Sequence, residues 1–295
     1  MRFPSRLIRG TLVQRYQRFL ADIRLPSGEI VTAHCTNTGS MMGCKEPGSV
    51  VYISRSDKEG RRLLYTWEII GIRGTWVGIN TMHPNRLVAE AVTSGAIREL
   101  RGYENTRREV VTRQGTRLDL CLEGSNGICF VEVKNVTLAV DGAAAFPDAV
   151  SERGTKHLKE LMWLRRKGHR AALVFVIQRN DCSVFRPADE IDAEYGRWLR
   201  RAVRAGVEAL PYRALVTPKE IVLTERLPIR LCSSSTLGNT CLREHVFLLL
   251  WHQGAPLEEE RLVSLGGVKY FREPSAKSCI SFRQKVELCR VVGVF

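Results

Sequence analysis

Two alternating stretches joined by a turn constrain the fold of this chain more than any other feature. Residues 116–122 carry leucine at every second position, and residues 128–134 carry valine at positions 131 and 133. The intervening residues 123–127 read EGSNG, which is turn chemistry, so the pattern predicts a β-hairpin. Strand side chains repeat every second residue, so Glu132 and Lys134 share one face. If the register brings Asp119 to that face, an Asp, a Glu and a Lys converge.

This trio has a specific chemical use. Two neighbouring carboxylates, Asp119 and Glu132, suit Mg²⁺ or Mn²⁺, which prefer oxygen ligands. The ammonium group of Lys134 can orient or deprotonate a water and offset charge on a phosphate. The arrangement resembles the PD-(D/E)xK nuclease superfamily, although Leu118 stands where the motif has Pro.

The alternative for the same residues is a solvated strand face with a weak ion pair. Val131 and Val133 argue against it, because they indicate an interior strand, where polar groups need a reason. The superfamily resemblance also implies a helix before the hairpin that lends a third acid. Glu90, beside an apolar stripe in residues 86–92, is the candidate, and an exposed helical Glu is the alternative.

The charge balance indicates the class of partner. The chain has 45 Lys and Arg against 31 Asp and Glu, a formal net charge of +14. Such an excess favours a polyanion, and we predict DNA as the partner. The alternative is that the arginine-rich composition reflects coding bias. Residues 232–295 hold eight basic and six acidic residues, so nearly all of the excess lies before them.

Composition also argues against membrane insertion. The sequence has no run of 18 apolar residues, and its first four residues, MRFP, do not open a signal peptide. We therefore expect a cytoplasmic protein without membrane contact. The nine cysteines are scattered without a C-x-x-C pair, so neither a zinc site nor a disulfide framework is indicated.

Residues 1–80 favour an all-β domain. About five short β-prone stretches separated by turns suggest a small barrel of the OB type. Such barrels bind single strands with basic and aromatic side chains, and Arg15, Tyr16, Arg18, Phe19 and Trp67 are candidates. The alternative is that the aromatic residues fill the barrel interior.

A small polar loop follows the second β-prone stretch of this region. His34 and Asn37 stand beside Gly39, and a glycine loop of this kind can approach phosphate closely through its backbone N–H groups. The alternative is a plain turn that caps the barrel.

Residues 81–231 alternate between helix and strand patterns in the order α-β-β-β-α-β-α-β, which predicts an α/β domain with a mixed central sheet. The apolar run 171–177 indicates a buried parallel strand. Ser151 is a suitable N-cap for the helix after the Glu-x-Lys strand. We expect Leu158, Leu161, Met162 and Arg165 on one face of that helix. Arg153, Lys156 and His157 then face elsewhere, as candidates for phosphate binding.

Over residues 3–230 the chain resembles the sugar fermentation stimulation protein A family. The matching runs are residues 15–22, 34–39, 41–43, 80–81, 85–87, 117–119, 132–134 and 146–158. Gly39-Ser40 is a mild departure from the family pattern. The resemblance implies an OB-like N-terminal domain, a PD-(D/E)xK-like C-terminal domain, DNA binding and a regulatory role in sugar (maltose) metabolism.

These observations predict three segments: an OB-like barrel over 1–80, a nuclease-like α/β domain over 81–231 and an atypical, poorly ordered extension over 232–295. Two functions remain open. The protein is either a DNA-binding regulator with a nuclease-like metal site, or an active Mg²⁺- or Mn²⁺-dependent DNA endonuclease. The sequence leaves the oligomeric state open, a homodimer included.

Overall fold

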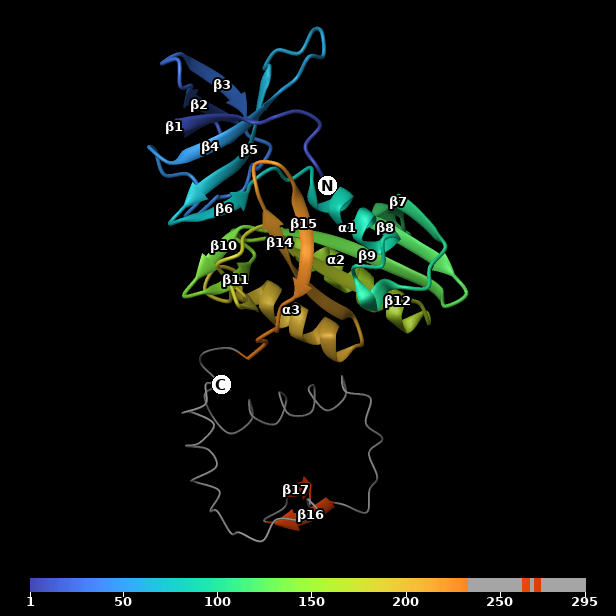
Figure 1. Ribbon diagram of the computed structural model, residues 1–295. Helices are drawn as coiled ribbons and strands as arrows, with labels where there is room; N and C mark the ends of the chain where they lie inside the picture. Colours follow the sequence, from blue (N-terminus) through green and yellow to red (C-terminus); the bar gives the residue numbers. More distant parts are fainter. Residues whose placement is uncertain (233–261, 266–267, 272–295) are drawn as a thin grey trace. The chain divides into compact units, whose positions relative to one another are not determined.

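The structure is a computed structural model that describes residues 1–232, 262–265 and 268–271 (Figure 1). The described residues 1–232 belong to one compact unit. In the second unit, β16 (Leu262–Leu265) and β17 (Val268–Phe271) pair antiparallel. The extension that was predicted to be poorly ordered, residues 232–295, lies outside the described residues except for Cys232 and this hairpin.

The N-terminal part is a barrel of the OB type, as predicted. Its strands are β1 (Ile8–Tyr16), β2 (Leu20–Arg24), β3 (Ile30–His34), β4 (Val50–Arg55), β5 (Tyr65–Ile72) and β6 (Thr75–Gly78). The sheet runs in the order β3-β2-β1-β4-β5-β6, and a parallel pairing of β3 with β5 closes it. Strands β1 to β5 therefore form the barrel, and β6 extends it from β5.

Alternating apolar residues of these strands fill the barrel interior. Leu12, Ile23, Ile53 and Trp67 are fully buried there. The Trp67 indole N–H donates to the carbonyl of Ile69 at 3.0 Å, so its polar atom is satisfied inside the core. Of the two alternatives for the barrel aromatics, packing in the interior holds for Trp67, because burial of its large apolar ring stabilises the core.

The α/β part has a six-stranded mixed sheet in the order β15-β14-β12-β9-β8-β7, with β9, β12 and β14 parallel. Its strands are β7 (Asn105–Val111), β8 (Arg117–Gly124), β9 (Gly127–Val136), β12 (Arg170–Ile177), β14 (Glu208–Val216) and β15 (Ile221–Arg226). A small second sheet contains β10 (Leu138–Val140), β11 (Ala143–Phe146) and β13 (Val184–Pro187). The helices are α1 (Pro84–Thr93), α2 (Glu152–Arg166) and α3 (Ala193–Arg204), with 3-10 turns at Arg98–Leu100 and Arg113–Gly115. The predicted mixed α/β fold is confirmed.

Helices cover both faces of this sheet (Figure 1). Helix α1 packs through Leu87 and Val88 into one cluster, together with Leu120 of the sheet. Helices α2 and α3 pack into a second cluster on the other face, which includes Leu118. The predicted common face for the leucines of β8 is thus wrong for Leu118, which joins the cluster beneath α2.

The predicted hairpin is present, with a tighter turn than expected. Strands β8 and β9 pair from Gly124 opposite Gly127 as far as Leu120 opposite Val131. Gly127 has φ +84°, which a residue with a side chain rarely adopts. Beyond Leu120 and Val131 both strands continue without pairing to each other, and this separation creates the candidate site.

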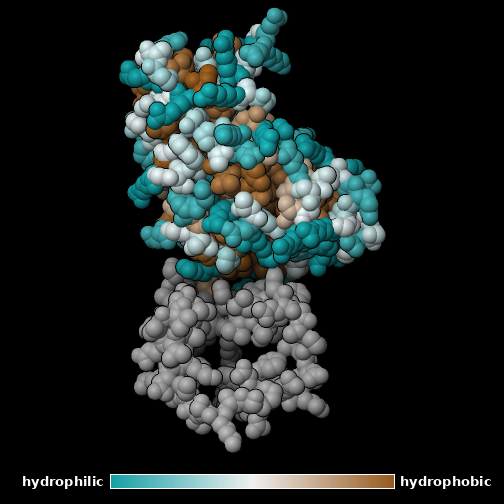
Figure 2. All heavy atoms as spheres, viewed as in Figure 1, coloured by the Kyte–Doolittle hydropathy of each residue, from teal (hydrophilic) through white to brown (hydrophobic). Residues whose placement is uncertain are grey.

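The barrel and the α/β part contact each other directly. The Ser40 hydroxyl donates to the backbone carbonyl of Asp148 at 2.7 Å, and the Gly78 N–H donates to the carbonyl of Gln178 at 2.9 Å. Hydrophilic residues cover most of the face seen in Figure 2, with hydrophobic side chains showing between them. In the part of the chain that the structure describes, no helix is long and apolar enough to cross a membrane.

Candidate functional site

Asp119 lies where β8 and β9 separate. One carboxylate oxygen accepts the backbone N–H of Val133 at 2.8 Å, and the other accepts the side-chain amide of Asn85 at 2.7 Å. The Val133 N–H would bond to β8 if the ladder continued. The side chain of Asp119 takes the place of that ladder bond and is held between the strand and α1.

Glu132, Lys134 and His157 meet on the α2 side of the sheet. Lys134 Nζ donates to Glu132 Oε1 at 2.6 Å, and His157 Nδ1 bonds the same oxygen. Only 3% of Glu132 is exposed. Its second oxygen, Oε2, is buried without a hydrogen-bond partner. A buried carboxylate oxygen with no partner is costly, and it marks a place for a further ligand.

The two carboxylates differ electrostatically. Burial, followed by repulsion from Glu132, raises the pKa of Asp119. For Glu132, burial alone would raise the pKa, but the His157 hydrogen bond and the charge of Lys134 outweigh it and the pKa is lowered. Neighbouring acids whose pKa values are driven apart are typical of sites that handle charge or protons. Among the described residues, no hydrogen bond or ion pair joins Asp119 to Glu132 or Lys134. Their predicted convergence therefore stays a prediction, with the charge of Glu132 contributing to the raised pKa of Asp119.

A divalent cation fits this pair. Mg²⁺ is commonly held by one or two carboxylates, with water or phosphate completing its shell. A cation beside Glu132 Oε2 would give that oxygen a partner, and it would offset the repulsion from Glu132 that contributes to the raised pKa of Asp119. No cluster of three or more His, Cys, Asp or Glu side chains suited to a metal is found among the described residues.

Glu90, the predicted third acid, makes its contacts elsewhere. Its carboxylate lies 3.1 Å from the N-terminal ammonium of Met1 and 2.7 Å from Arg86 Nε, and 42% of the side chain is exposed. Helix α1 brings Asn85 to Asp119 in its place. The apolar stripe led sequence reasoning to Glu90, whereas the first turn of the helix holds the contacting residue.

The three residues predicted on α2 separate into two groups. Arg153 and Lys156 are exposed, as expected of phosphate-binding candidates. His157 is 4% exposed and bonds Glu132, so its expected place on the outer face is wrong. His157 lies on the same buried face of α2 as Leu158, Leu161 and Leu164, in agreement with the 3.6-residue period of the helix. Ser151 caps the helix as predicted, accepting the Gly154 N–H at 3.0 Å.

The barrel candidates differ in the same way. Arg15 is half-buried, and one of its guanidinium nitrogens donates to the carbonyls of Arg18, Asn37 and Gly39 at 2.8 to 3.0 Å. It thereby ties together two loops of the barrel. Tyr16 donates to Asp22 at 3.2 Å, and Arg18 is exposed. Arg18 is the one of these side chains that is open to an external phosphate.

The polar loop of the barrel faces the α/β part. Asn37 is 6% exposed, and its oxygen accepts the Gly39 N–H at 2.9 Å. This is an Asx-type turn, the alternative considered for this loop. His34 is half-buried at the end of β3 and pairs through its backbone with β2 and β5.

A buried polar cluster at the domain junction was not predicted as a unit. Glu68 of β5 accepts hydrogen bonds from Ser54 at 2.6 Å and from Asn80 at 2.7 Å, and it pairs with His83 at 2.7 Å. Burial would raise the pKa of Glu68, but the His83 bond and charge outweigh it and lower the pKa. Charged residues distant in sequence give no local signal of such a cluster.

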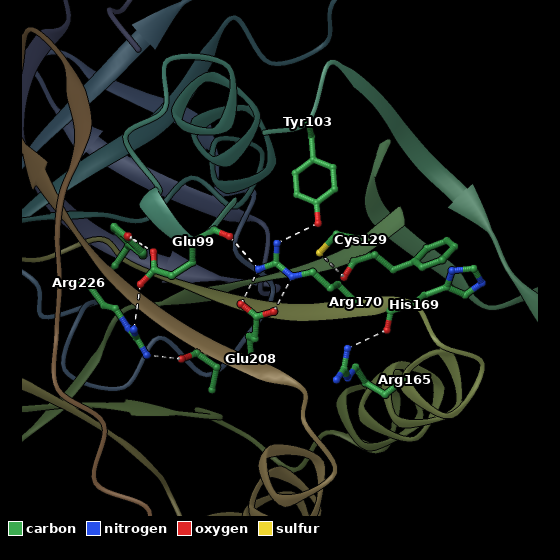
Figure 3. Close-up of polar contacts among 11 residues, drawn as sticks. Glu99, Tyr103, Cys129, Arg165, His169, Arg170, Glu208 and Arg226 are labelled. Atoms are coloured by element: carbon green, nitrogen blue, oxygen red, sulfur yellow. Dashed lines mark hydrogen bonds and ion pairs between the residues drawn. The ribbon is translucent and has the colours of Figure 1, made fainter. Parts of the chain in front are cut away.

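A second network lies at the amino ends of the parallel strands (Figure 3). Arg170 of β12 donates to both oxygens of Glu208 at 3.0 and 2.9 Å, to the Tyr103 hydroxyl at 2.9 Å and to the carbonyl of Glu99 at 2.8 Å. Ligands of open α/β sheets bind at the carboxyl ends of the strands. This network therefore joins strands and connecting segments, and the acid pair remains the candidate site.

A closed OB-like barrel followed by a mixed-sheet α/β domain defines this class of protein, and the second domain carries an Asp and a Glu-x-Lys strand beside a helix. Residues 13–79 match the family described as the SfsA N-terminal OB domain, and residues 82–220 match the sugar fermentation stimulation protein RE domain. The chain belongs to the sugar fermentation stimulation protein family.

Relatives named sugar fermentation stimulation protein homolog are similar over most of the chain. The one from Geobacter sulfurreducens is 60% identical over 229 residues, 78% of this chain and 98% of the relative. The one from Geobacter metallireducens is 57% identical over 230 residues, 78% of this chain and 99% of the relative. A solved structure of Pyrococcus furiosus SfsA in complex with Ca²⁺ is 29% identical, with a TM-score of 0.71, covering 78% of this chain and 98% of that one.

Proposed function

We propose that this protein binds DNA and that Asp119 and Glu132 hold Mg²⁺ or Mn²⁺ against a phosphodiester group. The observation that carries the proposal is the buried Glu132, with Lys134 beside it and Oε2 unpartnered, next to the half-buried Asp119. Like charges held near each other in a partly buried site are unfavourable without a cation. The relative from Pyrococcus furiosus was solved with Ca²⁺, another hard cation that takes oxygen ligands.

Charge supports DNA as the partner. The formal net charge is +14, and nearly all of it belongs to the part of the chain before residue 232. Helix α2 connects this charge to the site, since His157 on its inner face bonds Glu132 while Arg153 and Lys156 are exposed. A phosphate backbone beside α2 meets these cations close to the acid pair.

The side chains of the site have separable tasks in this proposal. His157 and Lys134 fix Glu132 through one oxygen, which leaves the other for a ligand. Asn85 and the Val133 N–H fix Asp119. A bound Mg²⁺ or Mn²⁺ supplies charge stabilisation for attack on a phosphodiester. Lys134, 13% exposed, is the group available to orient the attacking water.

A second candidate is a DNA-binding regulator of sugar (maltose) metabolism that does not cleave DNA. The family name favours it, and so does one contact. Lys134 is already engaged by Glu132 at 2.6 Å, so its ammonium group must be shared or released before it can act on a water. DNA binding is common to both candidates.

The test compares wild type with Asp119→Ala and with Asp57→Ala, which removes an exposed acid of the barrel. We expect millimolar Mn²⁺ to raise the melting temperature of wild type and Asp57→Ala but not of Asp119→Ala. DNA affinity, measured by fluorescence anisotropy, should be unchanged or higher in Asp119→Ala. For each protein, the logarithm of the affinity should fall linearly with the logarithm of the salt concentration. An equal Mn²⁺ response in all three proteins, or salt-independent binding, contradicts the proposal. Plasmid nicking by wild type alone favours the nuclease, and binding without nicking favours the regulator.

A further inference from the structure

A polar pocket of about 190 Å³ lies between the barrel and the α/β part. Its lining includes Asn37 and Thr81 from the barrel side and Asn135, Thr137, Phe146 and Asp148 from the other. Asn135 directly follows Lys134 on β9, so the pocket begins one residue from the candidate site. The pocket also lies at the carboxyl end of β9, where open α/β sheets bind ligands.

The orientation of the Asn135 amide is fixed by a chain of hydrogen bonds. The backbone carbonyl of Asn80 can only accept a hydrogen bond. Gln178 Nε2 lies 3.5 Å from this carbonyl oxygen and is therefore the donor. The same nitrogen donates to Asn135 Oδ1 at 2.7 Å, so Asn135 presents its oxygen to Gln178. Its NH₂ group has no partner among the described residues and is left for the pocket.

Asn37 and Asp148 are oriented by the same logic. The Gly39 N–H donates to Asn37 Oδ1, which leaves the Asn37 NH₂ group without a partner in the described chain. Asp148 Oδ2 accepts from Ser40 at 3.2 Å and from the Met41 N–H at 3.3 Å, which leaves Oδ1 open. Both side chains lie against Gly39. A methyl group added to Gly39 would be 3.0 Å from Asn37 Oδ1 and 3.4 Å from Asp148 Oδ1, so the two side chains are close to each other.

The pocket therefore offers amide donors and one carboxylate acceptor in a small space. Its volume is below the about 300 Å³ at which drug-sized ligand pockets begin, so it suits one ring system and not a whole nucleotide. Nucleobases carry donors and acceptors side by side on one edge. A carboxylate acceptor favours an exocyclic amino group, which adenine, cytosine and guanine have. The only donor on the Watson–Crick edge of thymine, N3–H, lies between two carbonyl oxygens that repel a carboxylate.

We infer that this pocket receives one unpaired nucleobase of a single-stranded nucleic acid whose backbone passes the acid pair. The inference rests on the proposed DNA binding and adds strandedness and base selection to it. In a duplex the Watson–Crick edges are paired, so a duplex can engage the protein only through its backbone and grooves. Single strands with amino-bearing bases should therefore bind tightest.

The test is a charge-neutral exchange, Asn135→Asp with Asp148→Asn. Asn135→Asp keeps an oxygen that accepts from Gln178, and Asp148→Asn keeps an oxygen that accepts from Ser40 and Met41. Inside the pocket, the donor at position 135 becomes an acceptor and the acceptor at position 148 becomes a donor. Anisotropy in EDTA would compare oligo(dA), oligo(dC), oligo(dT), an abasic strand and a duplex. We expect wild type to bind oligo(dA) and oligo(dC) about tenfold tighter than oligo(dT) and the abasic strand. The exchange should abolish or reverse this order of affinities. It should leave the affinities for the abasic strand and the duplex, and the slope of affinity against salt, unchanged.

A second variant protects the test against misfolding of the first. Asn37→Ser keeps a side-chain oxygen for the Gly39 N–H but removes the NH₂ group. It should weaken oligo(dA) and oligo(dC) selectively while its melting temperature stays near that of wild type. Equal affinity of wild type for base-bearing and abasic strands, or equal losses on every strand in a folded variant, overturns the inference while DNA binding stands. Failure of wild type to bind any strand overturns the proposed function itself.

Discussion

The carboxylate of Asp119 accepts the backbone N–H of Val133 at 2.8 Å, at the point where β8 and β9 cease to pair. This bond satisfies a strand N–H that would otherwise be left without a ladder partner. Together with the Asn85 amide at 2.7 Å, it fixes Asp119 without help from a ligand. The side chain of Asp119 is therefore preorganised, and the fold carries the cost of holding it near the charge of Glu132.

That cost gives the first prediction. Burial and the charge of Glu132 raise the pKa of Asp119, so in the absence of metal its contribution to stability is full below its usual pKa and is lost as pH rises through the raised value. At neutral pH, Asp119→Asn removes the repulsion and can still accept from Val133. We expect its melting temperature in EDTA to exceed that of wild type by a few degrees, about 1 kcal/mol at this chain length.

Differential scanning fluorimetry in EDTA and in Mn²⁺ measures this effect. Wild type should overtake Asp119→Asn once Mn²⁺ is added, since only wild type gains binding energy. A variant that is less stable than wild type in EDTA at every pH would mean that Asp119 serves the fold as an ordinary charged partner.

The fold was largely predictable because its signals are local. The hairpin, the apolar strand at 171–177 and the Ser151 cap each depend on a few neighbouring residues, and the structure has all three. The family resemblance added the order of the two parts. Local patterns of this kind need no knowledge of long-range contacts.

The site was only partly predictable because its support comes from distant segments. Strand alternation predicts Glu132 and Lys134 on one face, as the structure has them, but Asn85 and His157 reach Asp119 and Glu132 from separate helices. The sequence left Trp67 open between the surface and the interior, since a short strand pattern does not reveal which face closes the barrel. Register, strand separation and helix rotation decide these positions, and a single sequence does not encode them locally.

Adjacent residues of α2 give the second prediction. His157 is buried against Glu132, whereas Lys156 is exposed. Removing the partner of a buried hydrogen-bonding group typically costs about 1 to 3 kcal/mol, so His157→Ala should destabilise the protein. Lys156→Ala should change stability by less than about 0.5 kcal/mol and instead weaken DNA binding with a shallower salt slope.

Urea denaturation and anisotropy on the same two variants separate these effects. Because His157 is an interior residue, we expect His157→Ala to lose stability and Lys156→Ala to lose DNA affinity. A His157→Ala protein that is as stable as wild type but binds DNA poorly would return this residue to the phosphate-binding surface.

The Glu68 cluster predicts an acid-sensitive junction. The pKa of Glu68 is lowered, because the His83 contact and the Ser54 and Asn80 bonds outweigh burial. Its contribution is therefore present above the usual value of 4.5 and is lost as pH falls through the lowered value. Wild type should lose stability below pH 4.5, and Glu68→Gln should show a flatter profile in that range. Melting temperatures measured from pH 3 to 7 test this, and parallel profiles for the two proteins would contradict it.

The Arg170 network gives the last prediction (Figure 3). Arg170 bonds Glu208, Tyr103 and Glu99, while 31% of its side chain remains exposed, so solvent screens part of the attraction. Arg170→Ala leaves several acceptors without their donor and should cost about 1 to 2 kcal/mol, seen in urea denaturation. Arg186→Ala is the matched control, since it breaks an i,i+4 pair with the half-exposed Glu190 and should cost less than about 0.5 kcal/mol. Because the network lies at the amino ends of β9, β12 and β14, neither variant should alter the Mn²⁺ response or DNA affinity. A weakened Mn²⁺ response in Arg170→Ala alone would mean that these strands transmit strain from their amino ends to the acid pair.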